Sequence, residues 1–112
     1  MTEAELLDMV NKNKKPETLL EKVMDGISYD NADEFNENQL QDRIREQMPG
    51  YTIQTWDLDQ YQTAQIFGSV VEELKWPVDH GQVIEDIQYV EEWCTESEDA
   101  YFCILAYKTK QN

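Results

Sequence analysis

The chain has 112 residues, of which 24 are acidic and nine are basic, so its formal net charge is −15 at pH 7. This length suits a single globular domain over residues 1–112, and a hydrophobic fraction of 40% separates the chain from acidic disordered tails. The charge argues against direct binding to nucleic acid, which requires Lys and Arg to neutralise phosphates, and against binding to anionic membranes.

Three short helices are predicted in the N-terminal half. Thr2 and Glu5 form a capping box that begins a helix over residues 3–11. A second helix is expected over residues 16–25, where a proline stands at the first position and apolar residues recur at helical spacing. A third helix is expected where Leu40, Ile44 and Met48 recur at helical spacing, and the Pro-Gly pair at residues 49–50 ends it.

A strand and a long helix are predicted next. Residues 51–56 alternate and are rich in branched and aromatic side chains, which is typical of a strand. From residue 58 to residue 75 the apolar positions follow one helical face, with Asp57 as its N-cap and Pro77 at its end. Gly68 within this helix indicates a close approach by another element.

The last two segments are predicted to form a hairpin. Residues 83–94 fit both an alternating strand and a helix, and the strand is favoured because residues 100–109 form a clear strand that needs a neighbour. A turn at residues 96–99 would place Cys94 opposite Cys103. The same register would pair Trp93 with Ile104, and Val90 with Tyr107.

The C-terminal strand is apolar on both faces. Phe102, Ile104 and Ala106 point one way and the residues between them point the other way, which is typical of an internal or sandwiched strand. The predicted fold class is therefore α+β: a small three-stranded, mostly antiparallel sheet packed by one long helix, with two or three short N-terminal helices.

The chain carries no signature of catalysis or of a cofactor. His80 is its single histidine and lacks an identifiable partner, and the acidic run at residues 30–37 fails the calcium-loop pattern because Phe35 occupies the glycine position. Cys94 and Cys103 are too few for a disulfide scaffold or a zinc site. We therefore predict a non-enzyme without cofactor or metal, in which both cysteines serve packing.

Compartment is predicted from what the sequence lacks. It shows no secretion signal and no apolar run near the roughly 18 residues that span a bilayer. A cytoplasmic protein is therefore expected.

The acidic residues dominate the second half of the chain. Residues 1–50 have a net charge of −6, whereas residues 51–112 have a net charge of −9. Between Pro77 and Tyr107 there are eight acidic residues and not one Lys or Arg. A field of one sign attracts basic surfaces, so a basic protein is the expected class of partner.

A partner-binding surface is predicted on the strand over residues 83–94 and the turn after it. Carboxylates on alternate residues of a strand are about 6.7 Å apart, which approximates the spacing of phosphates along a nucleic-acid strand. Aromatic residues beside them would supply interface energy while the charges select the partner. The predicted partner-binding residues are Glu85, Tyr89, Glu91, Glu92, Trp93, Glu96, Glu98 and Asp99.

These properties are typical of DNA-mimic inhibitors, small acidic proteins common in phages and mobile elements. The expected function is therefore to block the basic nucleic-acid-binding surface of a nuclease or another DNA- or RNA-binding protein. Two alternatives remain open at this point. One is an immunity or antitoxin-like protein that neutralises a cationic toxin, and the other is an undistinguished cytoplasmic interaction domain whose acidic residues only keep its surface soluble.

Overall fold

The computed structural model describes residues 2–12, 19–25, 37–94 and 101–111. The elements in chain order are α1 (Glu3–Lys12), α2 (Leu19–Asp25), α3 (Glu37–Gln47), β1 (Thr52–Asp57), α4 (Thr63–Asp79), β2 (Gln82–Cys94) and β3 (Tyr101–Gln111). The predicted α+β class is confirmed, and residues 83–94 form a strand. No helix in these described ranges combines the length and the apolar character needed to cross a bilayer.

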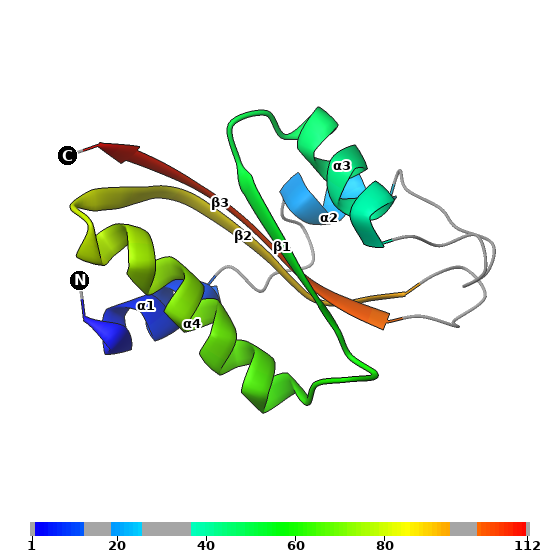
Figure 1. Cartoon of the computed structure of the whole chain (residues 1–112), viewed down its shortest axis with the longest axis horizontal. Helices are drawn as coiled ribbons and strands as arrows, with labels where there is room; N and C mark the ends of the chain where they lie inside the picture. The colour runs from blue at the N-terminus through cyan, green and yellow to red at the C-terminus, as the bar shows by residue number, and fades with distance from the viewer. Residues whose placement is uncertain (1, 13–18, 26–36, 95–100, 112) are drawn as a thin grey trace.

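The three strands form one antiparallel sheet in the order β1-β3-β2 (Figure 1). The last strand in sequence is therefore the central strand in space, as its two apolar faces predicted. β1 and β2 both run antiparallel to β3 and lie at the two edges of the sheet. Helix α4 carries the chain from one edge to the other.

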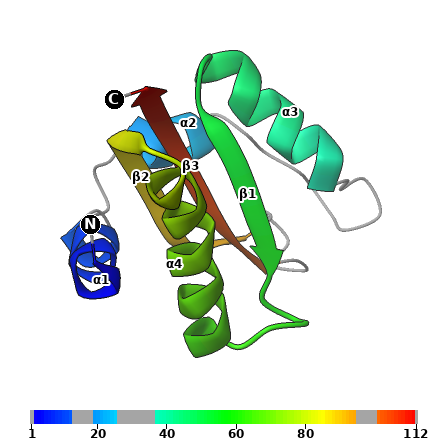
Figure 2. The same cartoon turned by 60° about the vertical axis from the view of Figure 1, so that its left-hand side comes forward.

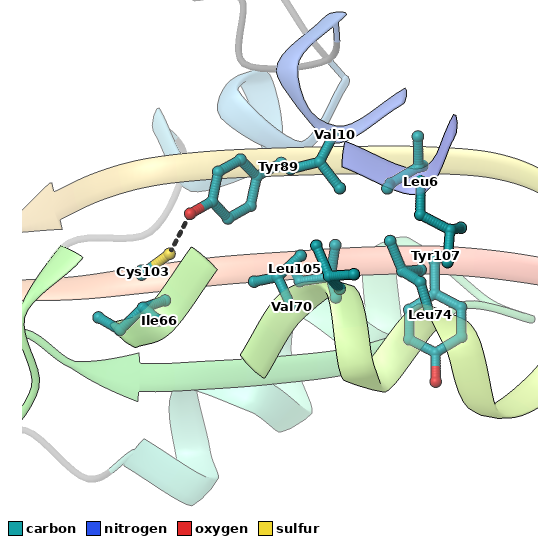
Figure 3. Packing of buried hydrophobic residues seen from close by; sticks show 11 residues of the cluster. Leu6, Val10, Ile66, Val70, Leu74, Tyr89, Cys103, Leu105 and Tyr107 are labelled. Atoms are coloured by element: carbon teal, nitrogen blue, oxygen red, sulfur yellow. Dashed lines mark hydrogen bonds between the residues drawn. The ribbon is translucent and has the colours of Figure 1, made fainter. Parts of the chain in front are cut away.

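Helices cover both faces of the sheet (Figures 1 and 2). Helices α1 and α4 pack on one face, and α2 and α3 pack on the other. The first core cluster, between the sheet and α1 and α4, consists of Leu6, Val10, Ile66, Val70, Val71, Leu74, Ile87, Tyr89, Cys103, Leu105 and Tyr107 (Figure 3). The second core cluster, on the opposite face, consists of Leu20, Val23, Met24, Leu40, Ile44, Met48, Ile53, Phe102, Ile104 and Ala106.

The N-terminal helices form largely where the sequence predicted them. The capping box of α1 is present, since Glu5 N donates to Thr2 Oγ1 at 3.2 Å and Thr2 N donates to Glu5 Oε1 at 3.4 Å. Helix α3 ends before a glycine, Gly50, whose φ is +87°. Residues 16–18 of the predicted second helix lie outside the described residues.

Both predicted ends of the long helix are wrong. Asp57 does not cap it, because the chain first turns and α4 begins only at Thr63, with Gln62 N donating to Gln65 Oε1 at 3.1 Å. Pro77 does not end it either. The helix continues to Asp79 because Val78 still packs against the first core cluster, so this burial outweighs the hydrogen bond that proline removes.

The close approach predicted at Gly68 is absent among the described residues. A Cβ atom built on Gly68 would meet no heavy atom within 4 Å. The glycine lies on the exposed side of α4, where it serves no packing role.

The predicted hairpin register is also wrong. Cys94 lies opposite Tyr101, Trp93 opposite Phe102, and Val90 opposite Ile104. The pairing shifts twice along β2, between Ile84 and Asp86 and between Val90 and Trp93, and the predicted turn at residues 96–99 falls outside the described residues. A regular alternating pattern in the sequence gives no sign of these bulges, so a register extrapolated from the turn could not match them.

Candidate functional site

Three of the predicted partner-binding residues stand at irregularities in the pairing of β2 with β3. The register of β2 and β3 passes over Glu85, Glu91 and Glu92, which stand at the two register shifts, and all three are exposed. By contrast, Ile87 and Tyr89 of β2 lie in the first core cluster, and Val90 and Trp93 pack against the second. The bulges therefore explain how a strand covered on both faces still presents carboxylates to solvent.

Tyr89 does not reach the surface, so its prediction as an exposed aromatic anchor is wrong. It is 1% exposed and lies in the first core cluster, where Cys103 Sγ donates to its hydroxyl oxygen at 3.1 Å (Figure 3). Burial raises the pKa of Tyr89, and the contact with Cys103 raises it further. The prediction assumed that β2 had one exposed face, whereas helices cover both.

The remaining predicted residues are Trp93 and three acidic residues that follow β2 in the sequence. Trp93 is half-buried and packs against the second core cluster. Glu96, Glu98 and Asp99 lie outside the described residues.

The predicted acidic surface divides into two ends. Glu85 is six positions from Glu91, which is about 20 Å along a strand, or more than twice the screening length of physiological salt. Near Glu85, β3 places Lys108 opposite Asp86 and Lys110 opposite Val83. Only the end at Glu91 and Glu92 lies away from these lysines.

At that end, Glu92 lines a hollow of about 660 Å³ that also involves the turn between β1 and α4. We call it the Tyr61 hollow, and its principal lining residues are Asp59, Tyr61, Glu92 and Tyr101. Tyr61 is 49% exposed. In the part of the chain that the structure describes, neither Lys nor Arg lines this hollow.

Backbone hydrogen bonds hold the turn that carries Asp59 and Tyr61. Asp59 N donates to Asp57 Oδ1 at 2.8 Å, and Tyr61 N donates to Asp57 O at 3.1 Å. Leu58 N donates to Tyr101 O at 3.0 Å, which fastens the turn to the start of β3. The turn therefore sets a tyrosine and a carboxylate beside Glu92 on a fixed framework.

Sequence reasoning missed Asp59, Tyr61 and Tyr101. A helix beginning at residue 58 would have placed Tyr61 on its buried face, whereas α4 begins at Thr63 and leaves Tyr61 in the turn. The sequence signal for this turn was Asp57, because an aspartate at the start of a turn accepts hydrogen bonds from the backbone N–H groups just after it. The same residue had been interpreted as a helix cap.

Two of the helices pair their cations with their own acids. Lys12 Nζ lies 2.8 Å from Asp8 Oδ2 in α1, and Arg45 Nη1 lies 3.1 Å from Asp42 Oδ1 in α3. The carboxylate of Asp8 also raises the pKa of Lys12, first through the hydrogen bond and then through its charge. These cations are bound locally, away from the Tyr61 hollow.

Among the described residues, no three His, Cys, Asp or Glu side chains gather in a way that would hold a metal ion. Cys94 and Cys103 are both free thiols, and the predicted pairing across the strands is not formed. His80 is exposed, and its imidazole stacks on Trp76.

Comparisons of the chain with models of protein families, with curated proteins and with solved structures found no significant match.

Proposed function

We propose that this protein is an acidic inhibitor that covers the basic nucleic-acid-binding surface of a nuclease or another DNA- or RNA-binding protein. The observation that supports this function is the Tyr61 hollow, where the carboxylates of Asp59 and Glu92 lie beside an exposed tyrosine and none of the described lining residues is Lys or Arg. Such a surface suits a cationic partner.

The two kinds of side chain contribute differently to this binding. A net charge of −15 accelerates the encounter with a basic surface, and carboxylates can take the places that phosphates would occupy there. Tyrosine contributes interface energy at little entropic cost, because its ring is rigid and amphipathic. Glu91 adjoins the hollow along β2, and three more acidic residues follow Glu92 within seven positions of the sequence.

The experiment compares two double variants that change the net charge equally. Asp59→Lys/Glu92→Lys alters the hollow, whereas Glu46→Lys/Asp79→Lys alters exposed positions on α3 and at the end of α4. Each variant raises the formal charge from −15 to −11, since each substitution adds two charges. Partners are captured from a host lysate on the wild-type chain and both variants, identified by mass spectrometry, and then purified.

The purified partner should bind nucleic acid by itself. Duplex DNA or RNA should displace it from the wild-type chain, and binding should weaken steeply as salt is raised. The hollow variant should lose at least tenfold in affinity, and the control variant should lose much less.

Equal affinity of the hollow variant and the wild-type chain would overturn the proposal, as would a partner that nucleic acid does not displace. A single tight partner that nucleic acid does not displace would support the immunity-like alternative instead.

A further inference from the structure

A second hollow lies between β1 and α4. Its volume is about 490 Å³. We call it the indole groove, and its principal lining residues are Gln54, Trp56, Glu72, Glu73, Trp76 and Tyr107. The groove shares no lining residue with the Tyr61 hollow.

Two tryptophans from different elements form its aromatic walls. Trp56, on β1, is half-buried and packs against the first core cluster. Trp76, on α4, is 61% exposed, although tryptophan is a residue that proteins mostly bury. Its ring stacks on His80 with centroids 4.1 Å apart and planes 23° apart, and His80 is not among the residues that line the groove. The stack therefore orients the indole without filling the groove.

Glu73 supplies a carboxylate that is already held in place. Its Oε1 accepts a hydrogen bond of 2.8 Å from the Tyr107 hydroxyl and one of 3.4 Å from Gln54 Nε2. Burial raises the pKa of Tyr107, and its hydrogen bond to Glu73 raises it further, so the phenol remains a donor at neutral pH. Among the described residues none donates to Glu73 Oε2, which leaves that oxygen available to a ligand.

The charge of the groove has one sign. Glu72 is exposed beside Glu73, and neither Lys nor Arg is among the described residues that line the groove. Two carboxylates and two indole rings in the lining of one groove suit a cation that can both stack and donate hydrogen bonds.

We propose that the indole groove binds an arginine side chain of a protein partner. A guanidinium is planar and weakly hydrated, so it can lie against an indole face while its N–H groups bind a carboxylate. A lysine ammonium is a compact, strongly hydrated charge that gains less from the aromatic walls. The inference does not depend on the proposed function, because the two hollows share no lining residue and the groove does not require the partner to bind nucleic acid.

The test uses three blocked peptides that differ in one side chain: acetyl-Gly-Arg-Gly-amide, the lysine peptide, and the citrulline peptide. Citrulline keeps the shape of arginine without its charge. Binding is followed by the indole N–H resonances of the intact 15N-labelled protein, in which Trp93 reports on a site that packs against the second core cluster and serves as an internal control. A single side chain should bind with a dissociation constant in the millimolar range.

The arginine peptide should shift the resonances of Trp56 and Trp76 and leave that of Trp93 unchanged. The lysine peptide should bind at least threefold more weakly, and the citrulline peptide should cause no saturable shift. Glu73→Gln, which keeps an oxygen acceptor for Tyr107, should weaken the arginine peptide at least fivefold. Trp76→Ala, at an exposed position, should do the same when followed at Trp56.

Glu46→Gln on α3 removes one negative charge elsewhere and should leave the affinity unchanged. An equal loss in Glu46→Gln and Glu73→Gln would show attraction by net charge alone and would overturn the assignment. Equal binding of the arginine and lysine peptides, or full affinity in the folded Trp76→Ala variant, would also overturn it.

Discussion

Thr55 of β1 accepts a 2.7 Å hydrogen bond from Gln41 Nε2 of α3, and its own hydroxyl donates to Glu37 Oε1 at the start of the same helix. Thr55 is buried, whereas the positions around it in the second core cluster are apolar. The threonine thus fastens α3 to the edge strand through one side chain.

Thr55→Val should therefore destabilise the fold by about 1–2 kcal/mol, because it leaves two polar partners without their bonds while preserving side-chain shape. Thr109→Val, at a half-buried position of β3, is the matched control and should change stability by less than about 0.5 kcal/mol. Urea denaturation followed by circular dichroism measures both. A smaller loss at Thr55 than at Thr109 would show that the bridge does not stabilise the fold.

The acidic residues of the bulge at Glu91 and Glu92 should also keep the chain from pairing with copies of itself. β2 is an edge strand, and charges and bulges are devices that protect such edges from further strand addition. Glu91→Val/Glu92→Val should raise the fraction of dimers and larger species in sedimentation velocity. Glu46→Val/Asp79→Val, an equal loss of two charges at exposed positions of α3 and α4, should remain like the wild-type chain. Monomeric behaviour of the double variant at high concentration would contradict this role.

Stability should fall at alkaline pH in part through Tyr51. Its hydroxyl donates to Asp86, and this hydrogen bond, followed by burial, raises the pKa of Tyr51 to about 12. The folded state thus keeps a proton that the unfolded chain releases near pH 10. The contribution is fully present below about pH 10 and is lost as the pH rises through about 12.

Tyr51→Phe should accordingly show a shallower fall in the free energy of unfolding between about pH 9 and pH 11.5 than the wild-type chain. Tyr61→Phe, at the exposed tyrosine of the β1–α4 turn, serves as the control and should follow the wild-type curve. Parallel curves for Tyr51→Phe and wild type would show that the Tyr51–Asp86 bond does not contribute to the pH dependence.

Two glycines should respond to alanine with opposite signs. Gly68 lies within α4 and a Cβ there meets nothing within 4 Å, so Gly68→Ala should stabilise the protein by about 0.5–1 kcal/mol through helix propensity. Gly81 has a φ of +82° at the end of α4, so Gly81→Ala should destabilise by about 1 kcal/mol despite equally open surroundings. Thermal unfolding of the two variants measures the contrast, and a stabilising Gly81→Ala would contradict the assigned backbone conformation.

Local patterns in the sequence predicted those elements whose causes are local. The capping box of Thr2 and Glu5 begins α1 as expected, and the apolar spacing of Leu40 and Ile44 marks the buried face of α3. The ends of α4 were not predictable in this way. Asp57 can begin a turn as well as a helix, and the tertiary packing of Val78 carries the helix past Pro77.

The candidate site was predicted only in part, and the reason is geometric. The carboxylates of Glu85, Glu91 and Glu92 are exposed as expected, but Tyr89, two positions before Glu91, lies in the core. The sequence shows an acidic strand, and it does not show where that strand bulges. Asp59 and Tyr61 join Glu92 through a fold that brings together residues some thirty positions apart, which no local pattern contains.

The amino-acid sequence by itself determined the net charge of −15, the α+β class and the central place of the C-terminal strand, because charge adds along a chain and an apolar pattern on both faces requires cover on both. Only the tertiary structure decided which carboxylates share a hollow with aromatic side chains: Glu92 and Tyr61 line the first, and Glu73, Trp56 and Trp76 line the second. These arrangements depend on two bulges in β2, on the position at which α4 begins and on the order of the strands. Each of these features is set by packing between residues that are far apart in the sequence.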